Sequence, residues 1–131
     1  MTRRGAFLLA VGLIQIILGW STVVAPPNAL AAYAVAGFIG PTFVGIAQIA
    51  LGTIAVVNAF WPPGKDRIGF MAAFPAPAFW ATDAVISSSF GYVAWGIGIR
   101  TACFWAGYAA LILLAAGMQG VADIARLSSR E

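Results

Sequence analysis

The sequence predicts an all-α integral membrane protein, a bundle of four transmembrane helices in a single domain with both termini in the cytoplasm. Of the 131 residues, 62% are hydrophobic and only 8% are charged, whereas an average soluble domain has about 25% charged residues. Mean hydropathy is +0.94, and several uncharged runs reach the roughly 20 residues that a helix needs to cross a bilayer. So few charges leave too little polar surface to cover a water-soluble globule.

The first expected span covers residues 5–25. It lies between the basic residues Arg3 and Arg4 and the prolines Pro26 and Pro27. The same run resembles a secretory signal peptide, because small residues lie near its end, where a peptidase would cut. A proline directly after the cut is a poor context for cleavage, so we expect the segment to be retained as a membrane helix.

The second expected span covers residues 41–60. Pro41 suits the first helical turn, because the N–H that it lacks would be unpaired there anyway. The tryptophan and prolines of residues 61–64 end this helix. Residues 28–40, between the first two spans, are uncharged and rather apolar, and we expect them to rest in the outer interface of the membrane.

The third expected span covers residues 68–88 and contains Pro75 and Pro77, which predict a kink. Residues 89–99 are apolar but rich in glycine, so an interfacial loop and a short re-entrant segment both remain open. The fourth expected span covers residues 101–122.

The basic residues set the expected orientation, because cytoplasmic loops carry an excess of lysine and arginine. Six of the seven basic residues would share one side of the membrane, against Arg100 alone on the other. The six are Arg3, Arg4, Lys65, Arg67, Arg126 and Arg130. This bias places both termini and the loop between the second and third spans in the cytoplasm. It requires an even number of crossings, which four spans provide.

The first two spans share a sequence pattern. Residues 11–24 read VGLIQIILGWSTVV and residues 44–57 read VGIAQIALGTIAVV, with eight of fourteen positions identical. Membrane helices use a small alphabet, so chance alignment is one explanation. A matched glutamine between two matched glycines favours a true repeat. Since successive helices cross in opposite directions, the repeat would be an inverted one.

The shared pattern places two glycines and a glutamine on one narrow face of each helix, at 100° per residue. These residues are Gly12, Gln15 and Gly19 in the first helix and Gly45, Gln48 and Gly52 in the second. Glycines allow a neighbouring backbone to come close, and an amide in the membrane needs a partner that lipid does not offer. We therefore expect both glutamines to point into the protein, where they serve either to hold helices together or to line a polar seam for transport.

Asp83 is the one acidic residue inside an expected span, and an ionisable residue at membrane depth is a candidate functional group. One hypothesis places Asp83 near the outer boundary, where it reaches water or pairs with Arg100. The other combines Asp83 with Gln15 and Gln48 in a polar seam for a proton, a cation or a small cationic solute.

Catalysis and cofactor binding have little basis in this composition. The chain has no histidine and one cysteine, Cys103, and no cluster of acids suited to a metal. The sequence pI of about 9.6 comes from charges spread over the whole chain, so no basic face follows a nucleic-acid backbone. We expect a protein that is no enzyme, with no cofactor, no metal and no nucleic-acid partner, surrounded by the lipid bilayer.

The start M-T-R-R, the four spans, the abundant alanine and glycine and the short basic tail resemble small membrane proteins of actinobacterial phages, many of which are called holin-like. The resemblance covers the whole chain in layout and gives no single residue a role. It implies a homo-oligomer in the cytoplasmic membrane that permeabilises or perturbs this membrane at a timed moment. The alternatives are a small carrier or ion pathway and a non-catalytic subunit of another membrane protein.

Overall fold

A computed structural model describes residues 2–26, 28–62 and 65–128, with side chains described up to residue 117. Its helices are α1 (Arg3–Val23), α2 (Ala34–Ile39), α3 (Pro41–Asn58), α4 (Arg67–Ala73), α5 (Pro75–Ser89) and α6 (Trp95–Ser128). Among the described residues, three stretches are long and apolar enough to cross a membrane: α1, α3 and Trp95–Gly117 of α6. The prediction of an all-α fold is confirmed for the described residues, and the three apolar helices are consistent with a membrane protein.

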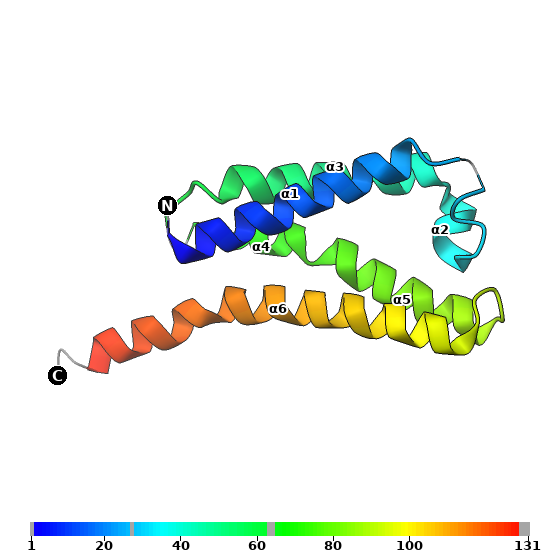
Figure 1. Cartoon of the computed structure of the whole chain (residues 1–131). Helices are drawn as coiled ribbons and strands as arrows, with labels where there is room; N and C mark the ends of the chain where they lie inside the picture. The colour runs from blue at the N-terminus through cyan, green and yellow to red at the C-terminus, as the bar shows by residue number, and fades with distance from the viewer. Residues whose placement is uncertain (1, 27, 63–64, 129–131) are drawn as a thin grey trace.

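Two pairs of helices make up the molecule. α1 packs along α3, α5 packs along α6, and the short helix α4 contacts members of both pairs. The chain runs back and forth along one direction, so that both termini lie at the same end, with α2 at the other (Figure 1). The side chain of Arg126 and all of Arg130, two of the basic residues used to set the orientation, lie outside the described part.

Glycines set the distance between α1 and α3. A Cβ atom added to Gly12 would lie 2.7 Å from the carbonyl oxygen of Gly52, and the reverse substitution gives the same distance. Gly19 and Gly45 face each other in the same way, at 2.7 and 2.6 Å. Because no side chain fits at these four positions, the two backbones touch. The glycine faces expected from the sequence therefore form an antiparallel helix contact within one chain.

Matched positions of the two similar sequences make matched contacts in this pair. Gly12 meets Val56 as Gly45 meets Val23, and Gly19 meets Ile49 as Gly52 meets Ile16. The four glycines thus make matched contacts across the pair, as in two antiparallel helices related by an approximate two-fold axis.

The third expected span is broken into two helices. α4 ends at Ala73 and α5 begins at Pro75, with Phe74 between them. Proline has no N–H to donate to the preceding turn, and its ring clashes with that turn, so Pro75 and Pro77 fit only where a helix starts. The expected kink is confirmed, as a break between two helices that together begin at Arg67.

α6, the helix that corresponds to the fourth expected span, begins at Trp95, earlier than the predicted residue 101. Residues 90–94 form a tight turn after α5, and Gly91 adopts a φ of 77° there, which favours glycine. Gly98 packs directly on Ser88 of α5, with no room for a side chain. Gly91 therefore serves a turn and Gly98 a close helix contact. Of the segment for which an interfacial loop or a re-entrant piece was expected, Ser89 ends α5, residues 90–94 form the turn and residues 95–99 begin α6.

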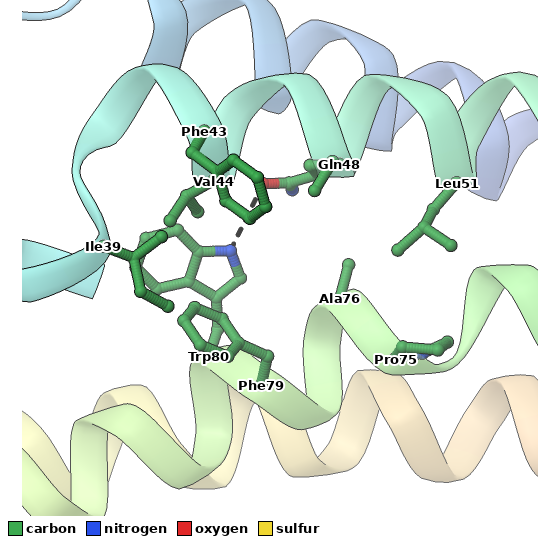
Figure 2. Close-up of a pocket in the computed structure, with 10 residues that line it drawn as sticks. Ile39, Phe43, Val44, Gln48, Leu51, Pro75, Ala76, Phe79 and Trp80 are labelled. Carbon is green, nitrogen blue, oxygen red and sulfur yellow. Dashed lines mark hydrogen bonds between the residues drawn. The ribbon is translucent and has the colours of Figure 1, made fainter. Parts of the chain in front are cut away.

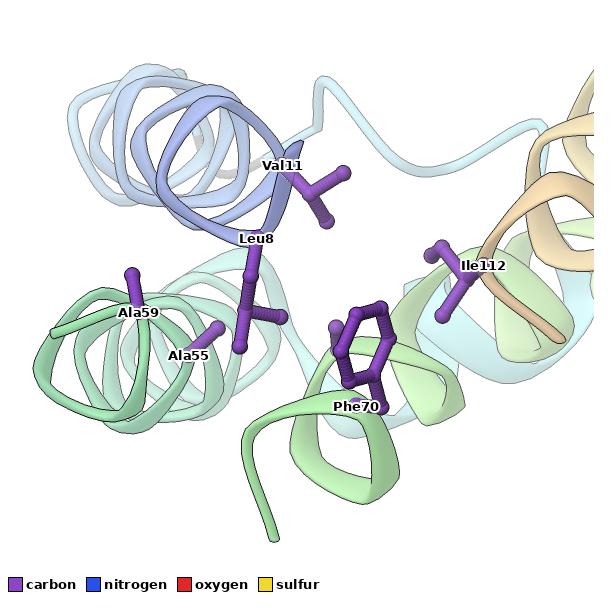
Figure 3. Close-up of a cluster of buried hydrophobic side chains, with 7 residues drawn as sticks. Leu8, Val11, Ala55, Ala59, Phe70 and Ile112 are labelled. Atoms are coloured by element: carbon purple, nitrogen blue, oxygen red, sulfur yellow. The ribbon is translucent and has the colours of Figure 1, made fainter. Parts of the chain in front are cut away.

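A cluster of buried apolar side chains closes the space between the two pairs in the half nearer the termini. Leu8 of α1 and Ile112 of α6 are fully buried, and Phe70 of α4 is 3% exposed. Figure 3 shows Leu8 directed between α1 and α3, with the Phe70 ring between that pair and Ile112. Side chains from α1, α3, α4 and α6 thus meet in one core.

Candidate ligand site between the helix pairs

Gln15 connects α1 to the broken third span. Its Nε2 donates to the carbonyl oxygen of Ala73 at 2.6 Å. This carbonyl is available because Pro77, one turn later, has no N–H to donate to it. Gln15 is 1% exposed, and within the described residues its Oε1 has no hydrogen-bond partner. The glutamine therefore replaces a helical hydrogen bond that proline removes.

Gln48 is held by a different partner. Its Oε1 accepts from Trp80 Nε1 at 3.3 Å, the dashed line in Figure 2. An indole N–H can only donate, which fixes the amide with its oxygen toward Trp80 and its nitrogen away from it. Gln48 is 3% exposed, yet its Nε2 donates to no residue in the described part of the chain.

Both glutamines point into the protein, as expected, but they do not join the first two helices to each other. Gln15 reaches α4 and Gln48 reaches α5. The glycines hold α1 to α3, and the glutamines then fasten this pair to the broken span. The sequence does not show this division of roles, because it does not show which carbonyl or indole lies opposite each amide.

Two cavities border Gln48 and Trp80. An apolar groove of about 230 Å³ lies between α3 and α5, with Phe43, Leu51 and Phe79 among its walls (Figure 2). A hollow of about 190 Å³ lies on α1, α3, α5 and α6 and on the chain before α2. It is lined by Leu18, Ser21, Thr22, Leu30, Tyr33, Gln48, Trp80 and Trp105. Gln48 and Trp80 thus form part of the wall of both cavities.

Aromatic rings form much of the wall of the hollow. The Trp80 ring lies 6.3 Å from Trp105, nearly parallel at 24°, and 5.5 Å from Tyr33, edge to face at 81°. Tyr108, one turn after Trp105, stands 6.1 Å from it. The Tyr108 hydroxyl is buried and has no partner among the described residues. Three separate segments of the chain bring these rings together, which no local motif indicates.

Asp83 holds the start of α2. Its two oxygens accept from Val35 N at 2.9 Å and Ala36 N at 2.8 Å. Ser87 accepts from Ala34 N at 2.8 Å and donates to Asp83 Oδ1 at 3.2 Å. Together the two side chains pair the first N–H groups of α2, as acceptors at a helix start do.

Asp83 does not pair with Arg100, which was one of the alternatives for an Asp83 near the outer boundary. The Nε of Arg100 donates to the carbonyl of Gly96 within α6 at 3.0 Å, and the residue is exposed. Asp83 is occupied by α2, a short helix inside residues 28–40 that the sequence pattern does not show. In the described part of the chain, Asp83 bonds neither Gln15 nor Gln48.

Arg4 forms a clamp at the end of the molecule where the termini lie, which the sequence analysis missed. Its guanidinium donates to both oxygens of Asp66, at 3.0 and 3.2 Å, and to the carbonyls of Ala115 and Ala116 at 2.8 and 2.9 Å. It also lies 4.6 Å above the Phe70 ring. Arg4 and Asp66 carry opposite charges and lie on the same expected side of the membrane, so the sequence did contain a sign of this ion pair. The Arg4 clamp fastens α1 to the start of α4 and to α6.

Among the described residues, no group of three or more histidine, cysteine, aspartate or glutamate side chains is placed to hold a metal. Cys103 lies exposed on α6. Comparison with protein-family models, with curated proteins and with solved structures finds no match to this chain.

Proposed function

We propose that the chain crosses the membrane four times, by α1, α3, the α4–α5 pair and α6. α4 and α5 have 7 and 15 residues, which at 1.5 Å per residue amount to about 33 Å of helix. The hydrocarbon core of a bilayer is roughly 30 Å thick, so the broken span is long enough. Four crossings agree with termini that lie at the same end in Figure 1.

The end that carries the termini faces the cytoplasm in this proposal. Arg3 and Arg4 begin α1 at that end, and Lys65 and Arg67 lie at the start of α4. Arg100 lies near the opposite end, early in α6. The excess of basic residues on one side is the pattern of cytoplasmic loops.

As the function we propose transport of a small solute, with the hollow as its site. The observation that supports this is an asymmetry along the membrane normal. The core of Leu8, Phe70 and Ile112 closes the space between the helix pairs on the cytoplasmic side. On the other side, residues of a second apolar cluster, around Trp80, line the hollow. A carrier presents a site near the midplane to one side at a time, and this arrangement suits the outward-facing state.

An inverted repeat of the first two helices belongs to the same proposal. The matched glycine contacts of α1 and α3 support it. Inverted helix pairs in known carriers supply two related arrangements around one site.

Cysteine labelling tests the proposed closure. With Cys103→Ser as background, Thr22→Cys places a thiol on the hollow and Val11→Cys places one in the closed half, where Val11 is 3% exposed. A membrane-impermeant maleimide added to intact cells should modify Thr22→Cys and leave Val11→Cys unmodified. Adding Asp66→Asn, which weakens the Arg4 clamp, should expose Val11→Cys to reagent from the cytoplasmic face in inverted vesicles.

The holin-like alternative, in which the chain permeabilises the membrane, predicts a different result. The glycine faces that would serve oligomer assembly are used inside one chain between α1 and α3. We expect a bacterium that expresses the chain at high membrane levels to keep its membrane potential and continue to grow. A delayed collapse of the potential, with Val11→Cys labelled equally from both sides, would favour the holin-like function over transport.

A further inference from the structure

The unused donor of Gln48 indicates a ligand in the cavities that this residue lines. The Trp80 N–H fixes the amide oxygen, and the Nε2 group has no partner in the described part of the chain although Gln48 is 3% exposed. Among the described residues, the fully enclosed polar side-chain atoms without a partner are Gln15 Oε1, Asn58 Oδ1 and Tyr108 OH. Gln48 Nε2 differs from them because Gln48 lines both cavities, so a ligand can reach this donor where lipid offers no hydrogen bond.

The walls of the hollow favour a neutral, flat occupant. Tyr33, Trp80 and Trp105 offer aromatic surface from three segments, and none of the residues that line the hollow or the groove is charged. The nearest acid along α5 is Asp83, whose oxygens are used by the N–H groups of α2. An ion in this place would lose its hydration without gaining a counter-charge.

The size and position of the cavities limit the ligand further. The hollow and the groove, at about 190 and 230 Å³, are each smaller than the roughly 300–1,000 Å³ of pockets for drug-sized molecules. The groove opens between α3 and α5 beside the same Gln48–Trp80 pair (Figure 2). A molecule from the hydrocarbon layer that enters the groove thus meets Gln48 and Trp80, which also line the hollow.

From these observations we infer that the hollow binds a small, neutral, lipid-soluble molecule with an aromatic ring, which lies on Trp80 and Trp105 and accepts a hydrogen bond from Gln48 Nε2. This inference names the ligand of the site used in the proposed function. It rests on that proposal only for the placement of the hollow inside the membrane.

Three naphthalene derivatives of one size test the inference. 2-Acetylnaphthalene is neutral and carries a carbonyl acceptor, 2-isopropenylnaphthalene has the same shape without an acceptor, and 2-naphthylmethylammonium is a cation. Their binding to the purified full chain in detergent micelles is measured by titration calorimetry, with empty micelles subtracted. We expect 2-acetylnaphthalene to bind about tenfold more tightly than the other two, since one hydrogen bond contributes about that factor.

Variants locate the binding. Gln48→Leu should lower the affinity for 2-acetylnaphthalene about tenfold, to the level of 2-isopropenylnaphthalene. Thr53→Val is the matched control on the same helix, because Thr53 is exposed and bonds only Ile49, and its affinity should stay unchanged. If Gln48→Leu fails to fold, as judged by far-UV circular dichroism, Trp105→Leu provides a second test through the aromatic wall, and its affinity should also fall.

Equal affinity for the two neutral compounds, tighter binding of the cation, or full affinity in both variants would overturn the inference. These outcomes are separate from those of the cysteine labelling. If the chain binds 2-acetylnaphthalene but Val11→Cys is never labelled, the ligand site stands and the proposed transport is wrong. If Val11→Cys becomes labelled as proposed but the chain binds the three compounds equally, the proposed transport stands and only the inferred ligand is wrong.

Discussion

Gln15 and Gln48 occupy matched positions in two similar helices, yet their surroundings differ. Gln15 donates a short bond of 2.6 Å to the Ala73 carbonyl, next to the closed core. Gln48 accepts a long bond of 3.3 Å from Trp80 and lies between two cavities. The difference shows that a shared sequence pattern fixes where a side chain points but not what it does there.

The broken third span is the origin of this difference. α1 and α3 present nearly the same face to it, but α4 ends opposite Gln15, where Pro77 leaves a carbonyl without a donor. One turn after Pro77, α5 presents the Trp80 indole to Gln48. One glutamine thus completes the backbone hydrogen bonds of a helix, and the other retains a free donor.

The largest expected effect is on the glycine contact that supports both glutamines. Gly52→Val should destabilise the protein by about 3 kcal/mol, because its Cβ would lie 2.7 Å from the Gly12 carbonyl oxygen and neither backbone can yield easily. Gly107→Val is the control, since nothing lies within 4 Å of its Cβ position. Unfolding by SDS titration in mixed micelles measures both, and equal stability of the two variants would contradict the close contact.

The next largest effect concerns the Arg4 clamp on the closed side. Arg4→Met should lower the free energy of unfolding by about 2 kcal/mol, because it removes two bonds to Asp66 and two to carbonyls of α6. Arg3→Met, next to it and exposed, should change the stability by less than about 0.5 kcal/mol. Similar losses in both variants would show that charge at the N-terminus matters, rather than these contacts.

The two glutamines should differ in how much stability is lost when each is replaced by leucine. Gln15→Leu leaves the buried Ala73 carbonyl without a donor and should cost about 1–2 kcal/mol in the SDS titration. Gln48→Leu removes only a long bond and should cost less than about 1 kcal/mol. The reverse order of the two losses would contradict the structural role of Gln15.

The smallest expected effect concerns Tyr108, which packs against the core of Leu8, Phe70 and Ile112. Tyr108→Phe removes a buried hydroxyl that has no partner among the described residues, so it should leave the stability unchanged within about 0.5 kcal/mol or raise it. A loss above about 1 kcal/mol in the same titration would indicate that this hydroxyl is hydrogen-bonded, for instance to a buried water.

Much of this architecture is available from the sequence. Hydropathy and helical periodicity indicate the helices and the inward faces of Gln15 and Gln48, since a period of 3.6 residues defines a face without knowledge of its partner. Pro75 and Pro77 indicate the break. These features depend only on residues close together in the chain.

Other features depend on packing between distant segments. α2 has six residues, too few for a periodic pattern, and it is stabilised by Asp83 and Ser87 from a different helix. Asp83 therefore indicated an ion pair or a polar seam rather than a helix cap. The hollow likewise combines rings from separate segments of the chain, which only the assembled structure brings together.

The most direct measurement compares the stabilisation of the two leucine variants by a ligand. A ligand that binds the folded state raises the free energy of unfolding, so the SDS titration is repeated with saturating 2-acetylnaphthalene. We expect Gln15→Leu, although less stable, to keep the increase seen in the unsubstituted chain, and Gln48→Leu to lose most of it. An increase that survives in Gln48→Leu and disappears in Gln15→Leu would contradict the assignment of the free donor to Gln48.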